Sequence, residues 1–293
     1  MTHRRILAAL LLCACLFALC PAAALAGEAD APVPEGCREA RIYVDGLLSG
    51  RAFTDESGLM WLAAEDLCAL LGLETRTSYD KDAGSLIVSG SDFVLCAVAG
   101  LDYFSVNSRY IYEPRGFFVF DRRAYFPLPV IERIFSGAPR VSSDGLRVDF
   151  SGAAMAVMPG GAAWYYDNFG SAEIFWLARI IRAEAGHQPL AGRIGVGNVV
   201  LNRVESDIYP DEVFGVVFDD KFAVQFDPAY SGSVYQEPEE LDVIAACLCL
   251  EGYNTVGESM YFVNPDLADD SWFRNTKEFV ITLGDHDFYK LKQ

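Results

Sequence analysis

Histidine is scarce in this sequence. The 293 residues include three, at positions 3, 187 and 286, and the first of them lies in an N-terminal leader. Zinc sites in proteins draw their ligands largely from histidine and cysteine, so this inventory argues against a multi-histidine metal centre. We expect no bound metal and no cofactor.

Positive charge is also in short supply. Lys and Arg number 23 against 41 Asp and Glu, which gives a net charge of −18. Without the leader residues Arg4 and Arg5 the balance is 21 minus 41, or −20. An acidic surface repels phosphate backbones, so we expect no nucleic-acid partner. The length and a hydrophobic content of 52% suffice for two modest cores.

The cysteines do not form a disulfide framework. Eight are present, and five remain after the leader, at positions 37, 68, 96, 247 and 249. An odd number of cysteines in a secreted chain of this size argues against systematic pairing. Cys247 and Cys249 lie two residues apart in an apparently helical segment, so they point to nearly opposite sides and cannot bridge each other. We expect buried free thiols.

Residues 1–26 have the pattern of a secretory signal peptide. Arg4 and Arg5 are followed by an apolar run and then by small residues that end at Ala26. A retained membrane anchor needs about 20 apolar residues, and Pro21 interrupts this run too early. A lipid anchor at the leader stays open as an alternative. The pattern predicts a secreted protein, and we expect a monomer.

The sequence predicts an α+β fold in two domains. Across 39–150, strand-like runs alternate with two short helical patterns. The segment 44–46 (VDG) matches 106–108 (VNS), and the segment 61–71 matches 125–135 at an offset of 64. We interpret the region as two repeats of a hairpin turn, further strand and a short helix.

The region 39–150 resembles the N-terminal domain of copper amine oxidases as it recurs in secreted proteins. The resemblance does not imply copper, since no histidine lies between residues 4 and 186. The resemblance implies an accessory role in binding the cell wall or a partner protein.

Residues 151–170 are rich in Gly and Ala and are predicted to be an interdomain linker. The aromatic residues Trp164, Tyr165 and Tyr166 within it are expected to dock on a neighbouring domain.

The remaining segment, 171–293, is predicted to be mainly helical with a small terminal β-hairpin. Its first helix ends at Gly186 and carries an apolar stripe, and Glu184 falls on the edge of that stripe. Arg179 and Arg182 lie well round the helix, so no cation of the helix stabilises the charged form of Glu184. Desolvation without such a partner raises the pKa of a carboxyl group, as a general acid at neutral pH requires.

Two further helices follow in this segment. The first runs from Pro189 to about Val204 and holds three glycines, at 192, 195 and 197, which predict close approach of another helix. Asn198 and Asn202 share the face beside that contact. The second helix begins after Glu237. The segments 260–263 and 280–283 are predicted to be the strands of the hairpin.

Five short segments of this region, taken in order, resemble one family. They are 177–186 (LARIIRAEAG), 195–204 (GVGNVVLNRV), 224–226 (VQF), 260–265 (MYFVNP) and 286–289 (HDFY). Together they look like the cell wall hydrolase family typified by the spore cortex-lytic enzyme SleB. The resemblance implies a lysozyme-like fold that cleaves peptidoglycan between N-acetylmuramic acid (MurNAc) and N-acetylglucosamine (GlcNAc), with Glu184 as the catalytic acid.

The resemblance further implies a lytic transglycosylase, in which one Glu suffices. That Glu protonates the leaving oxygen and then deprotonates the sugar's own 6-hydroxyl group, so no second carboxylate is required. Candidate substrate-binding residues are Asn198, Gln225, Tyr261 and Asn264. His286 and Tyr289 are expected to hold the C-terminus in place. Many members of the family carry a second acid four residues after the catalytic Glu, where this chain has Gln188.

Three alternatives stay open at this point. The first is a muramidase that uses water, with Asp227 or Glu237 assisting. The second is a non-catalytic wall-binding or spore-coat protein. The third, a zinc amidase, lacks ligands.

Overall fold

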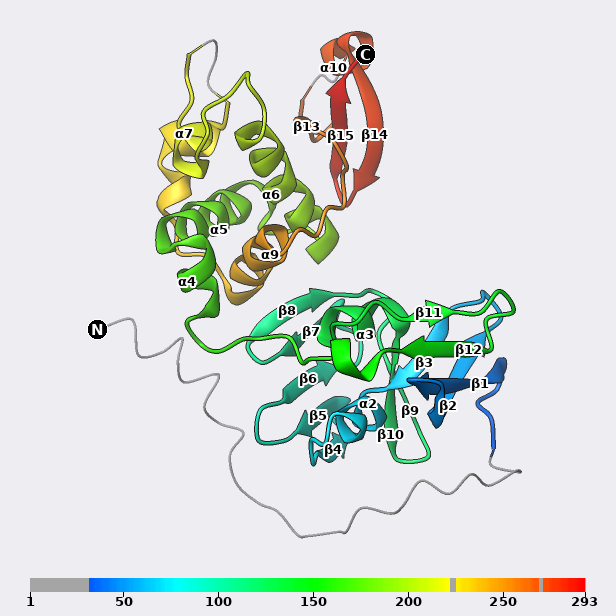
Figure 1. Ribbon diagram of the computed structural model, residues 1–293. Coiled ribbons are helices and arrows are strands. Elements are labelled where there is room, and N and C mark those ends of the chain that lie inside the picture. Colours follow the sequence, from blue (N-terminus) through cyan, green and yellow to red (C-terminus); the bar gives the residue numbers. More distant parts are fainter. Residues whose placement is uncertain (1–31, 222–224, 269–270, 293) are drawn as a thin grey trace. The chain divides into compact units, whose positions relative to one another are not determined.

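The computed structural model describes residues 32–221, 225–268 and 271–292. The predicted signal peptide, 1–26, lies outside the described residues. Residues 33–293 form one compact unit. Within that unit a β-rich segment precedes a mainly helical one, and each has a core of its own (Figure 1). The mixed α+β class predicted from the sequence is therefore confirmed, whereas the division into two domains stays a prediction. None of the described helices is both long and apolar enough to cross a membrane.

The larger sheet of the β-rich segment has seven strands in the order β11-β12-β1-β2-β3-β10-β9. Strand β1 pairs antiparallel with β2 and parallel with β12. The bounds are β1 Cys37–Val44, β2 Leu47–Asp55, β3 Met60–Ala63, β9 Phe118–Phe120, β10 Arg123–Pro127, β11 Arg140–Val141 and β12 Arg147–Phe150.

The second sheet is a five-stranded antiparallel meander in the order β4-β5-β6-β7-β8. Its strands are β4 Arg76–Asp80, β5 Ser85–Ser89, β6 Val94–Val98, β7 Tyr103–Val106 and β8 Arg109–Tyr112. Helices α2 (Ala64–Leu70) and α3 (Leu128–Ile134) follow directly on β3 and β10. Leu67 of α2 and Ile131 of α3 are fully buried in the same core.

The two segments that match in sequence also fold alike. Asp45 and Gly46 turn β1 into β2 with positive φ angles of 49° and 81°, and Asn107 and Ser108 turn β7 into β8 with φ angles of 49° and 65°. Positive φ at both central residues is the geometry of a type I′ hairpin turn, which suits the twist of the strands. Each repeat then ends in a strand and a short helix. The two equivalent strands, β3 and β10, pair antiparallel with one another.

Residues 151–170 are more structured than a linker. They contain the short 3₁₀ turn η1 (Gly152–Ala154) and helix α4 (Trp164–Phe169). Met155 and Met158 are buried in the core of the β-rich segment. Tyr165 is buried, and its hydroxyl oxygen accepts a hydrogen bond from the backbone N–H of Tyr110 at 2.8 Å. Tyr165 of the expected docking strip is therefore packed, whereas Tyr166 is 56% exposed.

Three helices, α5 (Ser171–Ala185), α6 (Leu190–Val204) and α9 (Glu240–Leu250), pack on one another in the helical segment (Figure 1). The glycines of α6 permit that packing. A Cβ on Gly197 would lie 2.6 Å from Cys249 Sγ of α9 and 3.0 Å from Ile181 Cδ1 of α5. The helix-helix contact predicted from the glycines is confirmed. The short helices α7 (Val213–Val217), α8 (Asp227–Ser231) and the 3₁₀ turn η2 (Ser233–Tyr235) complete this segment.

A three-stranded sheet ends the chain, and its pairing differs from the prediction. Its strands are β13 (Tyr261–Val263), β14 (Lys277–Leu283) and β15 (His286–Leu291), with helix α10 (Ser271–Thr276) before β14. β15 lies between the other two strands. The expected hairpin of 260–263 with 280–283 is therefore wrong, because 280–283 forms its hairpin with β15. His286 and Tyr289 lie in this central strand and are buried, as befits residues that hold the C-terminus.

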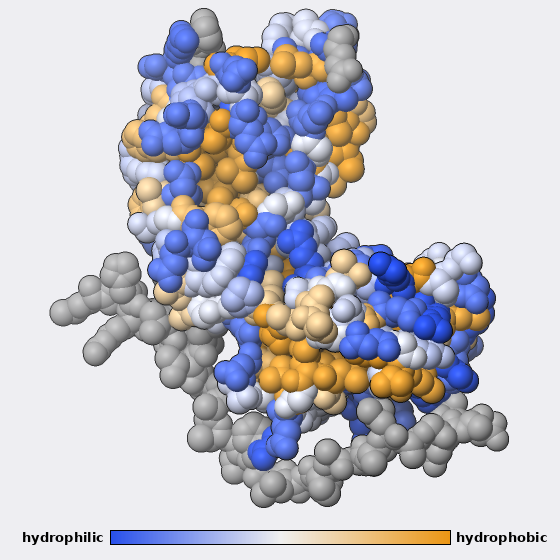
Figure 2. Space-filling model, in the orientation of Figure 1, coloured by the Kyte–Doolittle hydropathy of each residue, from blue (hydrophilic) through white to orange (hydrophobic). Residues whose placement is uncertain are grey.

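The five cysteines of the described residues are all free. Cys68, Cys247 and Cys249 are buried and the other two are half-buried. Burial raises the pKa of the Cys68 and Cys247 thiols to about 12, so neither is a thiolate at neutral pH. On the face drawn in Figure 2, apolar side chains gather in a band across the lower part and in smaller areas of the upper part, with hydrophilic side chains around them.

An ion pair joins the β-rich segment to the helical one. Arg109 of β8 makes two hydrogen bonds to the carboxylate of Glu251, at 2.7 and 2.6 Å, just after α9. The Arg109 guanidinium also stacks 3.6 Å from the centre of the Trp164 ring. Tyr112 packs edge-on against Tyr253.

Candidate functional site

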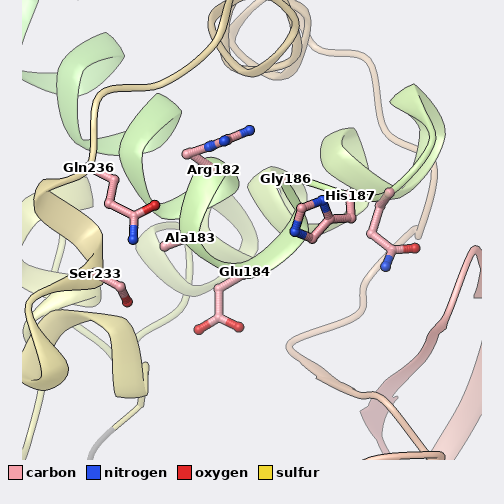
Figure 3. Close-up of a pocket in the computed structure, with 8 residues that line it drawn as sticks. Arg182, Ala183, Glu184, Gly186, His187, Ser233 and Gln236 are labelled. Atoms are coloured by element: carbon pink, nitrogen blue, oxygen red, sulfur yellow. The ribbon is translucent and has the colours of Figure 1, made fainter.

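Glu184 lies at the C-terminal end of α5 and lines a pocket of about 260 Å³. Helix α5 forms because an apolar face, including Leu177 and Ile181, packs into the core of the helical segment. Glu184 is half-buried at the edge of that face. The other residues that line the pocket come from the end of α5, the loop to α6 and the segment around η2 (Figure 3): Arg182, Ala183, Gly186, His187, Gln188, Ser233 and Gln236.

The environment of Glu184 favours the protonated carboxyl group. Burial, assisted by the negative charge of Asp227, raises the pKa of Glu184 to about 7, and the positive charge of Arg203 only partly opposes them. Within the part of the chain that the structure describes, no hydrogen bond or ion pair to the carboxylate occurs. Glu184 can therefore carry a proton near neutral pH and release it to a substrate.

The two arginines of α5 turn away from Glu184. Arg179 donates to the backbone carbonyl oxygens of Tyr235 and Gln236, each at 2.7 Å. Arg182 pairs with Glu239 at 2.8 Å, and Figure 3 shows its side chain and that of Glu184 leaving the helix in different directions. The sequence-based expectation that no cation of this helix neutralises Glu184 is confirmed.

Arg203 of α6 is a neighbour of Glu184 that the sequence reasoning missed. Its side chain is buried, and its Nε atom donates to the carbonyl oxygen of Met260 at 2.9 Å. Its guanidinium lies 4.9 Å from the ring centre of Phe226 and 5.8 Å from that of Tyr261. A buried arginine surrounded by rings from distant segments leaves no periodic signal, so only the fold could reveal it.

Of the predicted substrate-binding residues, Asn198 has the clearest structural role. It is buried in α6, where its Nδ2 donates to Tyr253 O at 2.8 Å and its Oδ1 accepts from Thr255 N at 3.0 Å. Both functions of the amide are therefore used in holding the segment after α9. This geometry favours a structural role over substrate contact.

The other three predicted residues are half-buried. Tyr261 of β13 lies beside Arg203 and 4.4 Å from Lys277 Nζ, measured to the ring centre. Gln225 stands just before α8, and its backbone N–H donates to Asp219 O at 3.3 Å. The Oδ1 atom of Asn264 accepts from Asp266 N at 3.0 Å, which forms a turn after β13. Val224, part of the motif at 224–226, lies outside the described residues.

The two acids considered as a second carboxylate have different surroundings. Asp227 is exposed at the first position of α8, and its charge acts on Glu184. Glu237 pairs with Arg179 at 2.9 Å, and its side chain is 80% exposed. Asp227 is therefore the acid that the fold couples to Glu184.

Among the described residues, no three His, Cys, Asp or Glu side chains gather in a way that could hold a metal ion. His187 is exposed at the pocket, whereas His286 is buried and burial lowers its pKa.

Comparisons with known proteins concern the C-terminal region. Residues 187–289 match a family described as Cell Wall Hydrolase, a range that begins three residues after Glu184. The resemblance of this region to that family is thereby confirmed.

The individual relatives are more specific. The spore cortex-lytic enzyme of Bacillus subtilis (strain 168) is 30% identical over 136 residues, which are 46% of this chain and 41% of that protein. The enzyme of the same name from Halalkalibacterium halodurans is 32% identical over 126 residues, 43% of this chain and 36% of that protein. The chain thus spans less than half the length of these curated relatives.

Two solved structures are also similar. The catalytic domain of a germination-specific lytic transglycosylase, SleB from Bacillus anthracis, is 28% identical and has a TM-score of 0.39. The match covers 42% of this chain and 98% of that one. The catalytic domain of the Bacillus cereus SleB protein is 30% identical with a TM-score of 0.37, over 40% of this chain and 89% of that one.

Proposed function

We propose that the protein cleaves the glycan strand of peptidoglycan as a lytic transglycosylase, with Glu184 as the single catalytic residue. The observation that carries the proposal is a half-buried carboxyl group in a pocket, without an ion-pair partner among the described residues, whose pKa is raised to about 7. The name of the curated relatives, spore cortex-lytic enzyme, supports an activity on this polymer.

The Glu184 carboxyl group acts twice in the proposed reaction, first as an acid and then as a base. The protonated carboxyl gives its proton to the oxygen between MurNAc C1 and GlcNAc C4, and the C1–O bond breaks to leave an oxocarbenium-like centre at C1. The Glu184 carboxylate then takes the proton of the MurNAc 6-hydroxyl as O6 bonds to C1. The product is a 1,6-anhydro ring, and Glu184 regains its starting proton without consumption of water.

A hydrolytic muramidase is the second candidate, and Asp227 favours it. Hydrolysis with two carboxylates needs a second acid near the first, and Asp227 is the acid whose charge reaches Glu184. In that mechanism water would replace the 6-hydroxyl, and the product would carry a reducing MurNAc end.

The rest of the chain is assigned around this activity. We propose a cleaved signal peptide at 1–26, secretion to the cell wall or spore envelope, and an accessory segment at 39–150 that resembles the N-terminal domain of copper amine oxidases. The region 171–293 is proposed to be the catalytic segment with a lysozyme-like fold. Tyr261, Gln225 and Asn264 are the proposed substrate contacts. Asn198 is not among them, because its amide holds the segment after α9. We propose that the protein acts as a monomer and requires no cofactor.

The Glu184→Gln variant tests whether the protein is an enzyme at all. The substitution keeps the shape of the side chain and removes its proton. We expect clearing of purified cell wall or cortex suspensions to fall by about 10²- to 10⁴-fold, the usual contribution of a general acid. Glu237→Gln, which removes an exposed acid paired with Arg179, is the matched control. Equal clearing by the Glu184→Gln variant and the parent would remove the basis for a catalytic Glu184.

A further inference from the structure

The loop between α5 and α6, which lines the Glu184 pocket, is tied to the turn between β14 and β15. Gln188 makes this connection. Its Nε2 atom donates to Asp285 Oδ2 at 3.0 Å, and its Oε1 atom accepts from the backbone N–H of Asp285 at 2.9 Å. Gln188 is 9% exposed. The amide thus uses both a donor and an acceptor on one residue that lies 97 positions further along the chain.

The turn is shaped to receive this amide. Gly284 has a φ of +59°, and a Cβ added there would lie 2.0 Å from Gln188 Oε1 and 3.0 Å from Pro189 Cδ. A side chain at position 284 would therefore displace the Gln188 amide. The residue before Asp285 must be small for the contact to form.

Arg193 holds the same loop from the other side. Its Nε atom donates to Gln188 O at 3.0 Å, and its Nη2 atom donates to Gly186 O at 2.5 Å. Arg193 is itself paired with Asp242, which is fully buried in α9. The backbone of 186–188 is thus fixed by α6, and its one buried side chain is fixed by the β14–β15 turn.

The charges around Gln188 explain why an amide stands there. Asp285 faces it directly, His286 follows in β15, Arg193 approaches its backbone from α6, and Glu184 and His187 line the same pocket. A carboxylate at position 188 would lie about 3 Å from that of Asp285, and two carboxylates so close cannot both ionise freely. An amide donates to the carboxylate and also accepts from its backbone N–H.

We propose that Gln188 is a positioning residue whose amide forms a lock with Asp285, and that this lock fixes the pocket wall beside Glu184 in place of a second acid. The lock itself is a property of the fold. Its effect on catalysis rests on the proposed function.

Four variants test the lock: Gln188→Glu, Asp285→Asn, the double variant, and Asn275→Asp as a control that adds one negative charge on exposed α10. The Gln188→Glu variant places two carboxylates together, so its folded state favours a shared proton. That stabilisation is present at low pH and is lost as the pH rises. The double variant restores the pair with donor and acceptor exchanged, because the amide then stands at position 285 and can donate to the carboxylate at position 188.

The first measurement is the thermal midpoint of the full chain at pH 5.5 and 7.5. For Gln188→Glu we expect the deficit relative to the parent to grow by at least about 4 °C between these pH values. The double variant should recover most of that deficit. Asp285→Asn and the control should show no growth of a deficit between the two pH values. An equal midpoint of Gln188→Glu and parent at both pH values would overturn the lock.

The second measurement is the release of soluble glycan fragments from purified walls at pH 7.5. We expect Gln188→Glu to lower kcat at least about 10-fold through misplacement of the pocket wall, with rescue in the double variant. Faster release by Gln188→Glu would mean that position 188 is a vacant acid site, and would overturn the proposal. If the parent releases no fragments, the proposed function fails, while the midpoints still decide the lock.

Discussion

At the scale of single residues, the proposed activity depends on the proton of Glu184. Burial raises the pKa of this group to about 7, so the acid form is abundant below that pH and declines above it. The alkaline limb of kcat/KM reports the pKa of this acid in the free enzyme. We therefore expect activity on soluble glycan fragments to fall as the pH rises through about 7.

The position of that limb should depend on Asp227. Its negative charge disfavours ionisation of Glu184, so its removal in Asp227→Asn lowers the pKa of Glu184 and moves the limb to lower pH. Glu237→Gln is the matched control and should leave the limb in place, because Glu237 pairs with Arg179. A pH–rate profile of the three proteins checks this. A fall in activity of about 10²-fold or more in Asp227→Asn, with the limb of the residual activity unmoved, would instead make Asp227 a second catalytic carboxylate.

The apolar setting of Glu184 on its own helix could be predicted from the sequence because those neighbours are local. The apolar neighbours of a helical residue lie three and four positions away, and these positions can be read directly. Arg203 and Asp285 could not be predicted, since each reaches the site from a distant element. The buried amide of Asn198 shows the same limit, because the backbone groups that it binds lie more than 50 residues away.

At the scale of elements, the packing of α6 depends on its glycines. A Cβ at Gly197 would lie only 2.6 Å from Cys249 Sγ. We expect Gly197→Ala to lower the free energy of unfolding by about 1–3 kcal/mol, the usual cost of overpacking. Denaturant unfolding measures this difference. The combination with Cys249→Ala should recover part of the loss, and Cys249→Ala alone is the control.

Helix propensity alone predicts that Gly197→Ala raises the free energy of unfolding. Ala is favoured over Gly in a helix by about 1 kcal/mol. A Gly197→Ala variant more stable than the parent would therefore contradict the close packing of α6 against α9.

Helices are easier to predict than strand partners. Helix α6 begins at Leu190 and ends at Val204, close to the predicted bounds, because its limits are marked by Pro189 and by the end of a periodic pattern. The predicted partner of β13 is wrong. Short strands carry no local signal for their neighbours, and pairing of β13 with β15 rather than β14 is decided by tertiary packing.

At the scale of the whole molecule, the ion pair of Arg109 with Glu251 couples the β-rich and helical segments. The side chains are only 13% and 5% exposed. Removal of one partner leaves a buried charge uncompensated, so we expect Arg109→Ala to cost about 3–5 kcal/mol of stability. Calorimetry measures this loss. Arg140→Ala, at an exposed arginine of β11, is the control. A stability loss below about 1 kcal/mol would show that this pair does not couple the segments.

The overall charge also bears on function. At −20 without the leader, the protein is expected to be only weakly attracted to anionic wall polymers. Under the proposed function, recognition of the glycan strand then depends on shape and hydrogen bonding at the pocket. Glu184 is not the only carboxyl group removed from solvent, since Asp66, Glu113 and Asp242 are buried, but each of those three pairs with an arginine.

In the proposed function, Glu184 alone drives an intramolecular ring closure. Mass spectrometry of the fragments released from purified peptidoglycan tests it most directly, since the two mechanisms differ by one water molecule in the product. We expect fragments with 1,6-anhydromuramic ends from the parent protein and none from Glu184→Gln. Fragments with reducing muramic ends, or equal release by the two proteins, would contradict it.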